Sequence, residues 1–138
     1  MSSLSKSLLL EAKAISRSAE QLDSFQVESA LSLLETCSEK KGKLVVSGVG
    51  KSGIVARKIA ATFSSIGFTA IYLNPLDALH GDLGVISSED IALFLSNSGN
   101  TQELLEIIPH LKRRDVKLIT ILGNIESAIG HNCDVVLN

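Results

Sequence analysis

The chain contains no tryptophan and only one tyrosine, so its core has to be built mainly from aliphatic side chains. No apolar run approaches the roughly 18 residues that a membrane-spanning helix needs. The first residues lack a long apolar segment behind a basic start, and they lack a small-residue cleavage site, which argues against a signal peptide. These absences predict a cytoplasmic protein that does not bind membranes.

Cysteines and blocks of like charge are also scarce. Cys37 and Cys133 are the only thiols, and neither belongs to a CxxC pair, so we interpret both as small buried hydrophobes in a reducing compartment. No group of histidines and cysteines has the spacing of a metal site. The net charge of −2 includes no basic block, which argues against binding to nucleic acid or to acidic membranes.

What the chain does have is a high apolar content, 45%, in 138 residues, which is enough for one packed domain. Its first part is helical in pattern. Apolar residues recur at helical spacing from Ser3 to Leu22, and Asp23 followed by Gln26 has capping-box spacing for a second helix that Gly42 would stop. We expect residues 1–41 to form a helical pair that packs on the sheet or on a second subunit. A DNA-binding role is disfavoured because the charges of the two helices nearly cancel.

The pattern then changes to short apolar runs that alternate with helical stretches. The runs "KLVVSG", "FTAIYL", "DIALFLS", "VKLITILG" and "CDVVLN" are typical of buried strands. Helices are expected over 54–67, 100–115 and 125–132, and a loop or short helix begins at Pro75. This alternation predicts an α/β fold in which helices flank a five-stranded parallel sheet in three layers, preceded by the two leading helices.

The glycine-rich stretch "SGVGKSG", residues 47–53, joins the first strand to a helix, and it resembles two known phosphate-binding loops. A Walker A loop is excluded because its opening glycine would have to stand at Val45. The dinucleotide pattern G-x-G-x-x-G fits at Gly48, Gly50 and Gly53, but Asn74 occupies the place of the acidic residue that holds the ribose. A dinucleotide site is therefore disfavoured.

A second loop, "SNSGNT" from Ser96 to Thr101, follows the third strand and opens a helix. Three hydroxyls and a glycine at a helix N-terminus favour binding of an anion, because the backbone N–H groups and the helix dipole point at it. A single N-cap residue would explain an ordinary helix start, but this loop has more hydroxyls than a cap needs. Loops after the first and third strands lie at the same edge of a parallel sheet, so one phosphorylated molecule can touch both.

Three stretches carry a family resemblance: "GVGKSGIVARKIAATFSSIG", "PLDALHGDLGVIS" and "LSNSGNTQELLEIIPHLKR". Together they resemble a sugar isomerase (SIS) domain, and within that family the KpsF/GutQ-type arabinose-5-phosphate isomerases. The resemblance implies a flavodoxin- or Rossmann-like SIS domain over residues 42–138. It also implies the interconversion of D-arabinose 5-phosphate and D-ribulose 5-phosphate through an enediol, in the supply of 3-deoxy-D-manno-octulosonate. Such enzymes need no metal or organic cofactor and are homo-oligomers, so a dimer or tetramer is expected.

The resemblance also implies roles for individual residues. Catalytic roles fall on Lys51, Glu103 and His80, with Asp82 placed to orient His80. Substrate and phosphate contacts are implied for Gly50, Ser52, Gly67, Phe68, Ser96, Asn97, Ser98, Gly99 and Thr101.

Two departures from the family pattern bear on the activity. Some members hold zinc with a histidine where this chain has Asn74, so no metal site is expected. Family enzymes also continue beyond the position of Asn138 with a further functional glutamate and histidine. We therefore expect either the first part of a longer, C-terminally truncated isomerase, or a short module that binds or senses a phosphosugar without catalysis.

Overall fold

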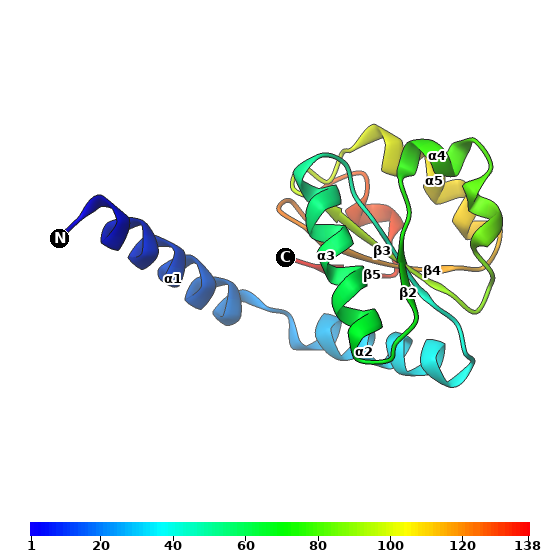
Figure 1. The fold of residues 1–138 in the computed structure, drawn as a ribbon, viewed down its shortest axis with the longest axis horizontal. Helices are drawn as coiled ribbons and strands as arrows, with labels where there is room; N and C mark the ends of the chain where they lie inside the picture. The colour runs from blue at the N-terminus through cyan, green and yellow to red at the C-terminus, as the bar shows by residue number, and fades with distance from the viewer.

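Five short strands form one parallel sheet in the computed structural model, which describes residues 1–138 (Figure 1). The strand order is β2-β1-β3-β4-β5, and all four pairings are parallel. This confirms the predicted α/β class and the five predicted strands. The strands are β1 (Leu44–Ser47), β2 (Ala70–Tyr72), β3 (Ile91–Ser96), β4 (Lys117–Leu122) and β5 (Val135–Leu137).

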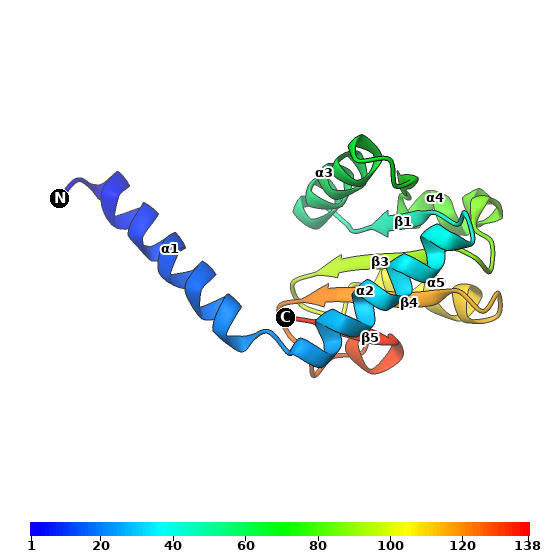
Figure 2. The ribbon, with the colours of Figure 1, turned by 90° about the horizontal axis from the view of Figure 1, so that it is seen from below.

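Helices cover both faces of the sheet and complete the three layers (Figures 1 and 2). One face packs on α2 (Ser24–Glu39) and α3 (Lys51–Ser65), and the other packs on α4 (Pro75–Leu79), α5 (Gln102–Lys112) and two short 3-10 helices. These are η1 (Asp82–Val85) and η2 (Gly130–Asn132). No helix is both long enough and apolar enough to cross a membrane.

The central strand β3 shows why the sequence reads as a continuous apolar run. All six of its residues are buried. Leu93 faces the core shared with α2 and α3, whereas Ala92 and Phe94 face the core shared with α5. Because side chains alternate between the faces of a strand, a strand covered on both sides has no position that faces solvent, and its residues are apolar at nearly every position.

The two leading helices behave differently. Asp23 caps α2, and its carboxylate accepts from the N–H groups of Phe25 (2.9 Å) and Gln26 (3.2 Å), as expected from the capping pattern. The Gln26 side chain does not complete a capping box; its Oε1 instead accepts from the N–H of Val136 on edge strand β5 at 2.8 Å. This bond ties α2 to the sheet.

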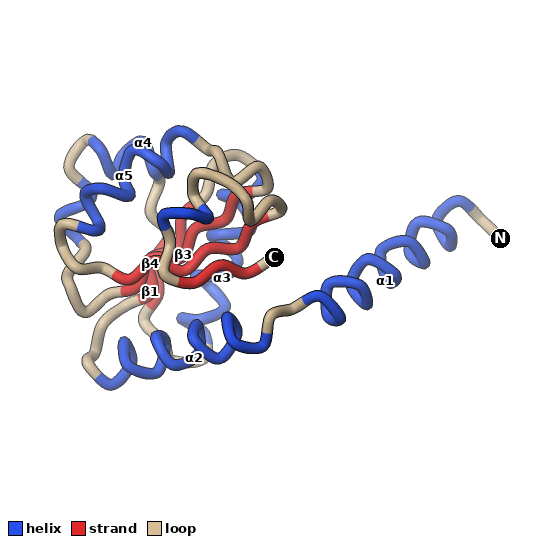
Figure 3. The backbone as a smooth tube through the Cα atoms, turned by 180° about the vertical axis from the view of Figure 1, so that it is seen from behind, coloured by secondary structure: helices blue, strands red, loops and turns tan.

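The first helix, α1 (Ser3–Gln21), buries none of its residues and projects away from the domain (Figures 1 to 3). Of the two arrangements expected for the leading helices, packing on the sheet is therefore wrong for α1, and packing on a second subunit stays a prediction. The reason lies in the connection: Leu22 and Asp23 are both extended, with φ/ψ of −59°/126° and −76°/108°. An extended link carries α1 past the end of α2 instead of folding it back along the domain.

The helix expected over 125–132 is another difference, because only the 3-10 turn η2 forms there. In this segment the N–H of Ala128 donates to the side chain of Asn100 (3.1 Å) and that of Ile129 to the carbonyl of Gly99 (2.9 Å). Both N–H groups are thus used by a neighbouring loop, so they cannot donate to carbonyls four residues back, as an α-helix requires.

Candidate phosphosugar site

The order β2-β1-β3-β4-β5 places a topological switch point between β1 and β3. In an open parallel sheet, ligands bind beyond the carboxyl ends of the strands at such a point, because the neighbouring connections leave on opposite faces. Here the connection after β1 leads to α3 on one face, and the connection after β3 leads to α5 on the other. The two loops singled out in the sequence are thus the loops that flank this position.

The β1–α3 loop is shaped by its glycines and by the only tyrosine. Gly50 has φ +61° and ψ −125° and precedes α3 without any side-chain cap, so the first N–H groups of α3 stay open. A Cβ added at Gly53 would lie 2.7 Å from the Gly48 carbonyl oxygen, so the two glycines let the turn close tightly. The Tyr72 hydroxyl donates to that same carbonyl at 3.0 Å, and the Arg57 guanidinium lies 4.0 Å from the centre of the Tyr72 ring.

The β3–α5 loop is held by its own hydroxyls. The hydroxyls of Ser96 and Thr101 are hydrogen-bonded at 2.7 Å, and Ser96 Oγ accepts from the N–H of Gly99 at 3.0 Å. Ser98 Oγ accepts from the N–H of Asn100 at 3.1 Å. Because Thr101 uses its hydroxyl on Ser96, it makes no side-chain cap to α5. The first N–H groups of an eleven-residue helix therefore remain open for an anion.

A third connection, from β4 to β5, supports this loop, and the sequence analysis did not identify it. Gly99 has φ +70°, and a Cβ at this position would lie only 2.0 Å from the hydroxyl oxygen of Ser127. The bonds from Ile129 to Gly99 and from Ala128 to Asn100 fix the same contact. Asn100 thus positions the loop, although its only sequence signal was its place between a glycine and a threonine.

Four of the predicted residues line one cavity of about 400 Å³ at the carboxyl edge of the sheet. Lys51 and Ser52 come from the first turn of α3, Ser96 is the last residue of β3, and Asn97 follows it in the β3–α5 loop. The remaining walls are formed by Val55, Leu95, Ile121, Leu122, Gly123 and Asn138. Lys51 is exposed and makes no ion pair, so its ammonium group is free to meet an anion in this cavity.

The other two predicted catalytic residues do not line this cavity. Glu103 is half-buried in the first turn of α5 and makes no hydrogen bond or ion pair through its side chain. His80 is exposed at the end of α4, and its imidazole makes no hydrogen bond to Asp82. The structure therefore brings Lys51 together with the β3–α5 loop at one cavity, whereas Glu103 and His80 do not line that cavity.

A family model described as "SIS domain" matches residues 38–138. The chain belongs to the SIS domain family. Arabinose 5-phosphate isomerase KpsF of Escherichia coli O6:H1 is 39% identical over 99% of this chain and 41% of its own length. Arabinose 5-phosphate isomerase GutQ of Salmonella typhimurium is 42% identical over 96% of the chain and 40% of its own length. The chain thus spans about two fifths of these curated relatives.

Solved structures agree with this SIS fold. A candidate sugar-phosphate isomerase from Listeria monocytogenes superposes with a TM-score of 0.89 at 37% identity, covering 96% of this chain and 68% of that one. The c3406 protein of E. coli CFT073, solved in complex with arabinose 5-phosphate, has a TM-score of 0.79 at 35% identity and covers 100% of this chain and 74% of that one. The fold expected from the sequence motifs is therefore confirmed.

Gly67 and Phe68 do not line the cavity that contains Lys51 and Ser96. They follow the C-terminal end of α3 and precede β2, whose Ala70 pairs with Leu44 at the start of β1. They therefore lie at the amino edge of the sheet, about 22 Å along α3 from Lys51 at 1.5 Å per residue. Phe68 packs edge-on against Phe63, with ring centres 5.4 Å apart. Within one chain this pair is too far from the cavity to share a substrate with Lys51, so the expected contact stays a prediction that requires a second chain.

Asn74, where the family resemblance places a zinc-binding histidine in some members, has a structural role here. Its side-chain oxygen accepts from the N–H of Leu76 at 3.0 Å and so caps α4. No group of three or more His, Cys, Asp or Glu side chains is arranged to hold a metal ion. The two thiols are unpaired, and burial raises the pKa of Cys133 to about 12, which makes it unreactive as a nucleophile at neutral pH.

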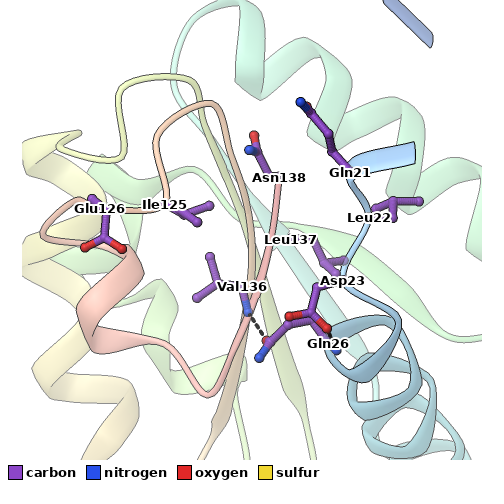
Figure 4. A pocket seen from close by; sticks show the side chains of 9 residues that line it. All are labelled: Gln21, Leu22, Asp23, Gln26, Ile125, Glu126, Val136, Leu137 and Asn138. Carbon is purple, nitrogen blue, oxygen red and sulfur yellow. Dashed lines mark hydrogen bonds between the residues drawn. The ribbon is translucent and has the colours of Figure 1, made fainter. Parts of the chain in front are cut away.

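A second cavity, of about 290 Å³, lies beside β5 at the joint between α1 and α2 (Figure 4). Gln26, which is hydrogen-bonded to Val136, lines this cavity together with Leu22, Ile125 and Glu126. None of the predicted site residues lines it. The cavity at the switch point is therefore the candidate phosphosugar site.

Proposed function

We propose that this chain forms the phosphosugar-binding part of an aldose–ketose isomerase that interconverts D-arabinose 5-phosphate and D-ribulose 5-phosphate. The observation that carries the proposal is the cavity that joins Lys51 and Ser52 to Ser96 and Asn97 at the switch point. The identity to arabinose 5-phosphate isomerases and to the c3406 protein in its sugar-phosphate complex supports the choice of substrate. The homo-oligomer and the cytoplasmic location expected from the sequence stay part of this proposal.

The phosphate group is assigned to the β3–α5 loop. The uncapped N-terminus of α5 offers N–H groups and the positive end of the helix dipole, and the hydroxyl of Ser98 adds a donor at the exposed side of the loop. Ser96 and Thr101 bond to each other, so their role is to hold the loop in the shape that receives the phosphate. The sugar then extends across the cavity toward α3.

The reaction moves a proton between two neighbouring carbons. A base removes the proton from C2 of the aldose, the electrons form an enediolate, and a proton returns to C1, while the proton on O2 is exchanged for one on O1. Glu103 is assigned as the acid or base and His80 as the group that exchanges protons with the oxygens. The ammonium group of Lys51 stabilises the negative charge of the enediolate.

The test is an isomerase assay with matched acidic variants on one helix. Glu103→Gln should reduce turnover by at least about a hundredfold, because a general acid or base contributes about 10² to 10⁴ in rate. Glu106→Gln is the control, since Glu106 lies one turn further along α5 and is exposed. Equal activity in the two variants would overturn the role of Glu103. The assay includes a chain extended to the length of the relatives, so that a missing segment is not mistaken for a wrong assignment.

The second candidate is a phosphosugar-binding module without catalysis. The observation in its favour is that Glu103 and His80 do not share the cavity with Lys51. This candidate predicts that arabinose 5-phosphate raises the melting temperature of the chain while no isomerisation occurs, because a ligand that prefers the native state stabilises it. Lys51→Met should abolish the temperature shift, whereas Lys58→Met, further along α3, should preserve it.

A further inference from the structure

Helix α3 carries a cation that has no polar partner. Arg57 is exposed, and its side chain makes no hydrogen bond and no ion pair. The central carbon of its guanidinium lies instead 4.0 Å from the centre of the Tyr72 ring, well within the range of a cation–π interaction. The neighbouring Lys58, by contrast, donates to the Thr62 hydroxyl at 3.1 Å. The Tyr72 ring is therefore the group that orients the guanidinium of Arg57.

Tyr72 connects this cation to the β1–α3 loop. It is the last residue of β2, and its half-buried ring packs against the core on the α3 side of the sheet. Its hydroxyl donates to the Gly48 carbonyl at 3.0 Å. A Cβ added at Gly53 would lie 3.1 Å from the same hydroxyl, so the tyrosine reaches the point where the turn closes on α3. The orientation of the ring therefore decides whether the hydroxyl holds Gly48.

A positive charge over the ring acts on this hydrogen bond in two ways. It favours the ring orientation in which the aromatic face meets the guanidinium, and it repels the hydroxyl proton, which makes the phenol a better donor. Neither effect requires Arg57 to contact a ligand. Arg57 does not line the cavity that contains Lys51 and Ser96. Apart from its long-range charge, the route from Arg57 to that cavity runs through Tyr72 and the loop.

The loop depends on this route because little else holds it. The bond from Tyr72 is the only side-chain hydrogen bond that involves residues 48–52. Gly50, with φ +61°, precedes α3 without a side-chain cap, and Lys51 is the first residue of the helix. Lys51 lies three residues after Gly48, so a displacement of the Gly48 carbonyl moves the start of α3 and the lysine with it.

We propose that Arg57 is a positioning residue for Lys51. Through the Tyr72 ring it holds the Gly48 carbonyl, and so keeps the β1–α3 loop in the arrangement that presents Lys51 to the cavity. The inference rests on the proposed function, because it takes arabinose 5-phosphate as the ligand that Lys51 meets. A ligand that binds one loop arrangement binds more weakly when that arrangement is less populated. Loss of Arg57 therefore lowers affinity without removing a ligand contact.

Isothermal titration calorimetry of arabinose 5-phosphate with the 138-residue chain tests this assignment. Arg57→Gln removes the charge and should raise the dissociation constant about two- to fivefold, which corresponds to an exposed cation–π contact. Arg57→Lys keeps a cation that can reach the ring, so its dissociation constant should stay within about twofold of the original and below that of Arg57→Gln. Lys58→Gln is the matched control, since it removes the neighbouring charge from the same helix, and it should bind like the original.

A second background shows whether Arg57 acts through the tyrosine. Tyr72→Phe keeps the ring beside the guanidinium but removes the hydroxyl that holds Gly48. In that background Arg57→Gln should change the dissociation constant by less than about 1.5-fold, because the two residues form one route to the loop. An equal loss of affinity in both backgrounds would mean that Arg57 meets the ligand directly, and it would overturn the assignment.

The ring also provides a signal that does not need the ligand. Tyr72 is the only tyrosine and the chain has no tryptophan, so the tyrosine band in near-ultraviolet circular dichroism comes from this one residue. Arg57→Gln should reduce the band, whereas Arg57→Lys and Lys58→Gln should preserve it. An unchanged band in Arg57→Gln, or an unchanged affinity in a chain that binds arabinose 5-phosphate, overturns this inference alone. If the original chain binds no arabinose 5-phosphate, the proposed function fails together with it.

Discussion

Gly99→Ala is the change that tests most directly how the β3–α5 loop, the proposed phosphate-binding loop, is held. The added Cβ would lie 2.0 Å from Ser127 Oγ, 2.5 Å from Ser127 Cβ and 2.8 Å from the carbonyl oxygen of Asn124. Gly99 also has φ +70°, a conformation that costs an alanine about 1–2 kcal/mol. Overpacking of a tight contact adds about 1–3 kcal/mol. We therefore expect the free energy of unfolding to fall by about 2–5 kcal/mol.

Gly67→Ala separates these two contributions. Gly67 has φ +87°, but a Cβ there meets nothing within 4 Å, so this variant carries only the backbone cost. Any gain from a stiffer unfolded chain is the same in both variants and cancels in their difference. Urea titration should place the midpoint of Gly99→Ala about 0.5–1.5 M below that of Gly67→Ala, for a slope of about 2 kcal/mol per M.

A double variant checks the contact itself. Ser127→Gly removes both side-chain atoms nearest to the added Cβ, so Gly99→Ala should cost less in that background than alone. If Gly99→Ala and Gly67→Ala unfold at the same urea concentration, the close packing between the β3–α5 loop and the β4–β5 connection is refuted. The same conclusion would follow from a cost that Ser127→Gly leaves unchanged.

Two further predictions concern hydrogen bonds, one near the carboxyl ends of the strands and one near their amino ends. Tyr72→Phe removes the hydrogen bond to the Gly48 carbonyl, so urea titration should show a free energy of unfolding lower by about 0.5–1.5 kcal/mol. Calorimetry should also show weaker binding of arabinose 5-phosphate. Unchanged binding would exclude a role for Tyr72 in positioning the β1–α3 loop. Burial opposes ionisation of Asp90, but the Lys43 side chain and the N–H groups of Ser87 and Lys43 outweigh it and lower its pKa. Asp90→Asn should therefore lower the free energy of unfolding by about 1.5–3 kcal/mol at pH 7. In thermal unfolding, the difference in stability between this variant and the original chain should shrink as the pH falls below about 4 and on through the lowered pKa of Asp90. A stability difference that does not depend on pH would contradict this prediction.

Local patterns in the sequence predicted the elements well, because each strand and long helix has its own signal. The run from Ile91 to Ser96 is apolar at nearly every position, and a strand buried on both faces requires that. The two glycine and hydroxyl loops were also predictable, since both follow strands and open helices. Their meeting at one cavity followed from the parallel order of the strands.

What the sequence could not predict depends on contacts between distant residues. Ser127 and Gly99 are 28 positions apart, and neither carries a signal that names the other. Gln26 has capping-box spacing, but its side chain bonds to Val136 at the far end of the chain. The helical spacing of apolar residues in α1 left open whether the helix packs on the sheet or on a second subunit, and the extended link at Leu22 directs it away from the sheet.

The division of the site implies an order of dependence between binding and turnover. Lys51, Ser52, Ser96 and Asn97 line one cavity within a single chain, so this part of the proposed phosphosugar site forms without a second subunit. Glu103 and His80 do not line that cavity, so the turnover proposed above requires these two side chains to approach the sugar. Loss of Glu103 can therefore remove turnover and leave binding intact. Gly99→Ala alters the geometry of the β3–α5 loop and should weaken both, so a folded Gly99→Ala chain that binds and isomerises arabinose 5-phosphate like the original would contradict the proposed site.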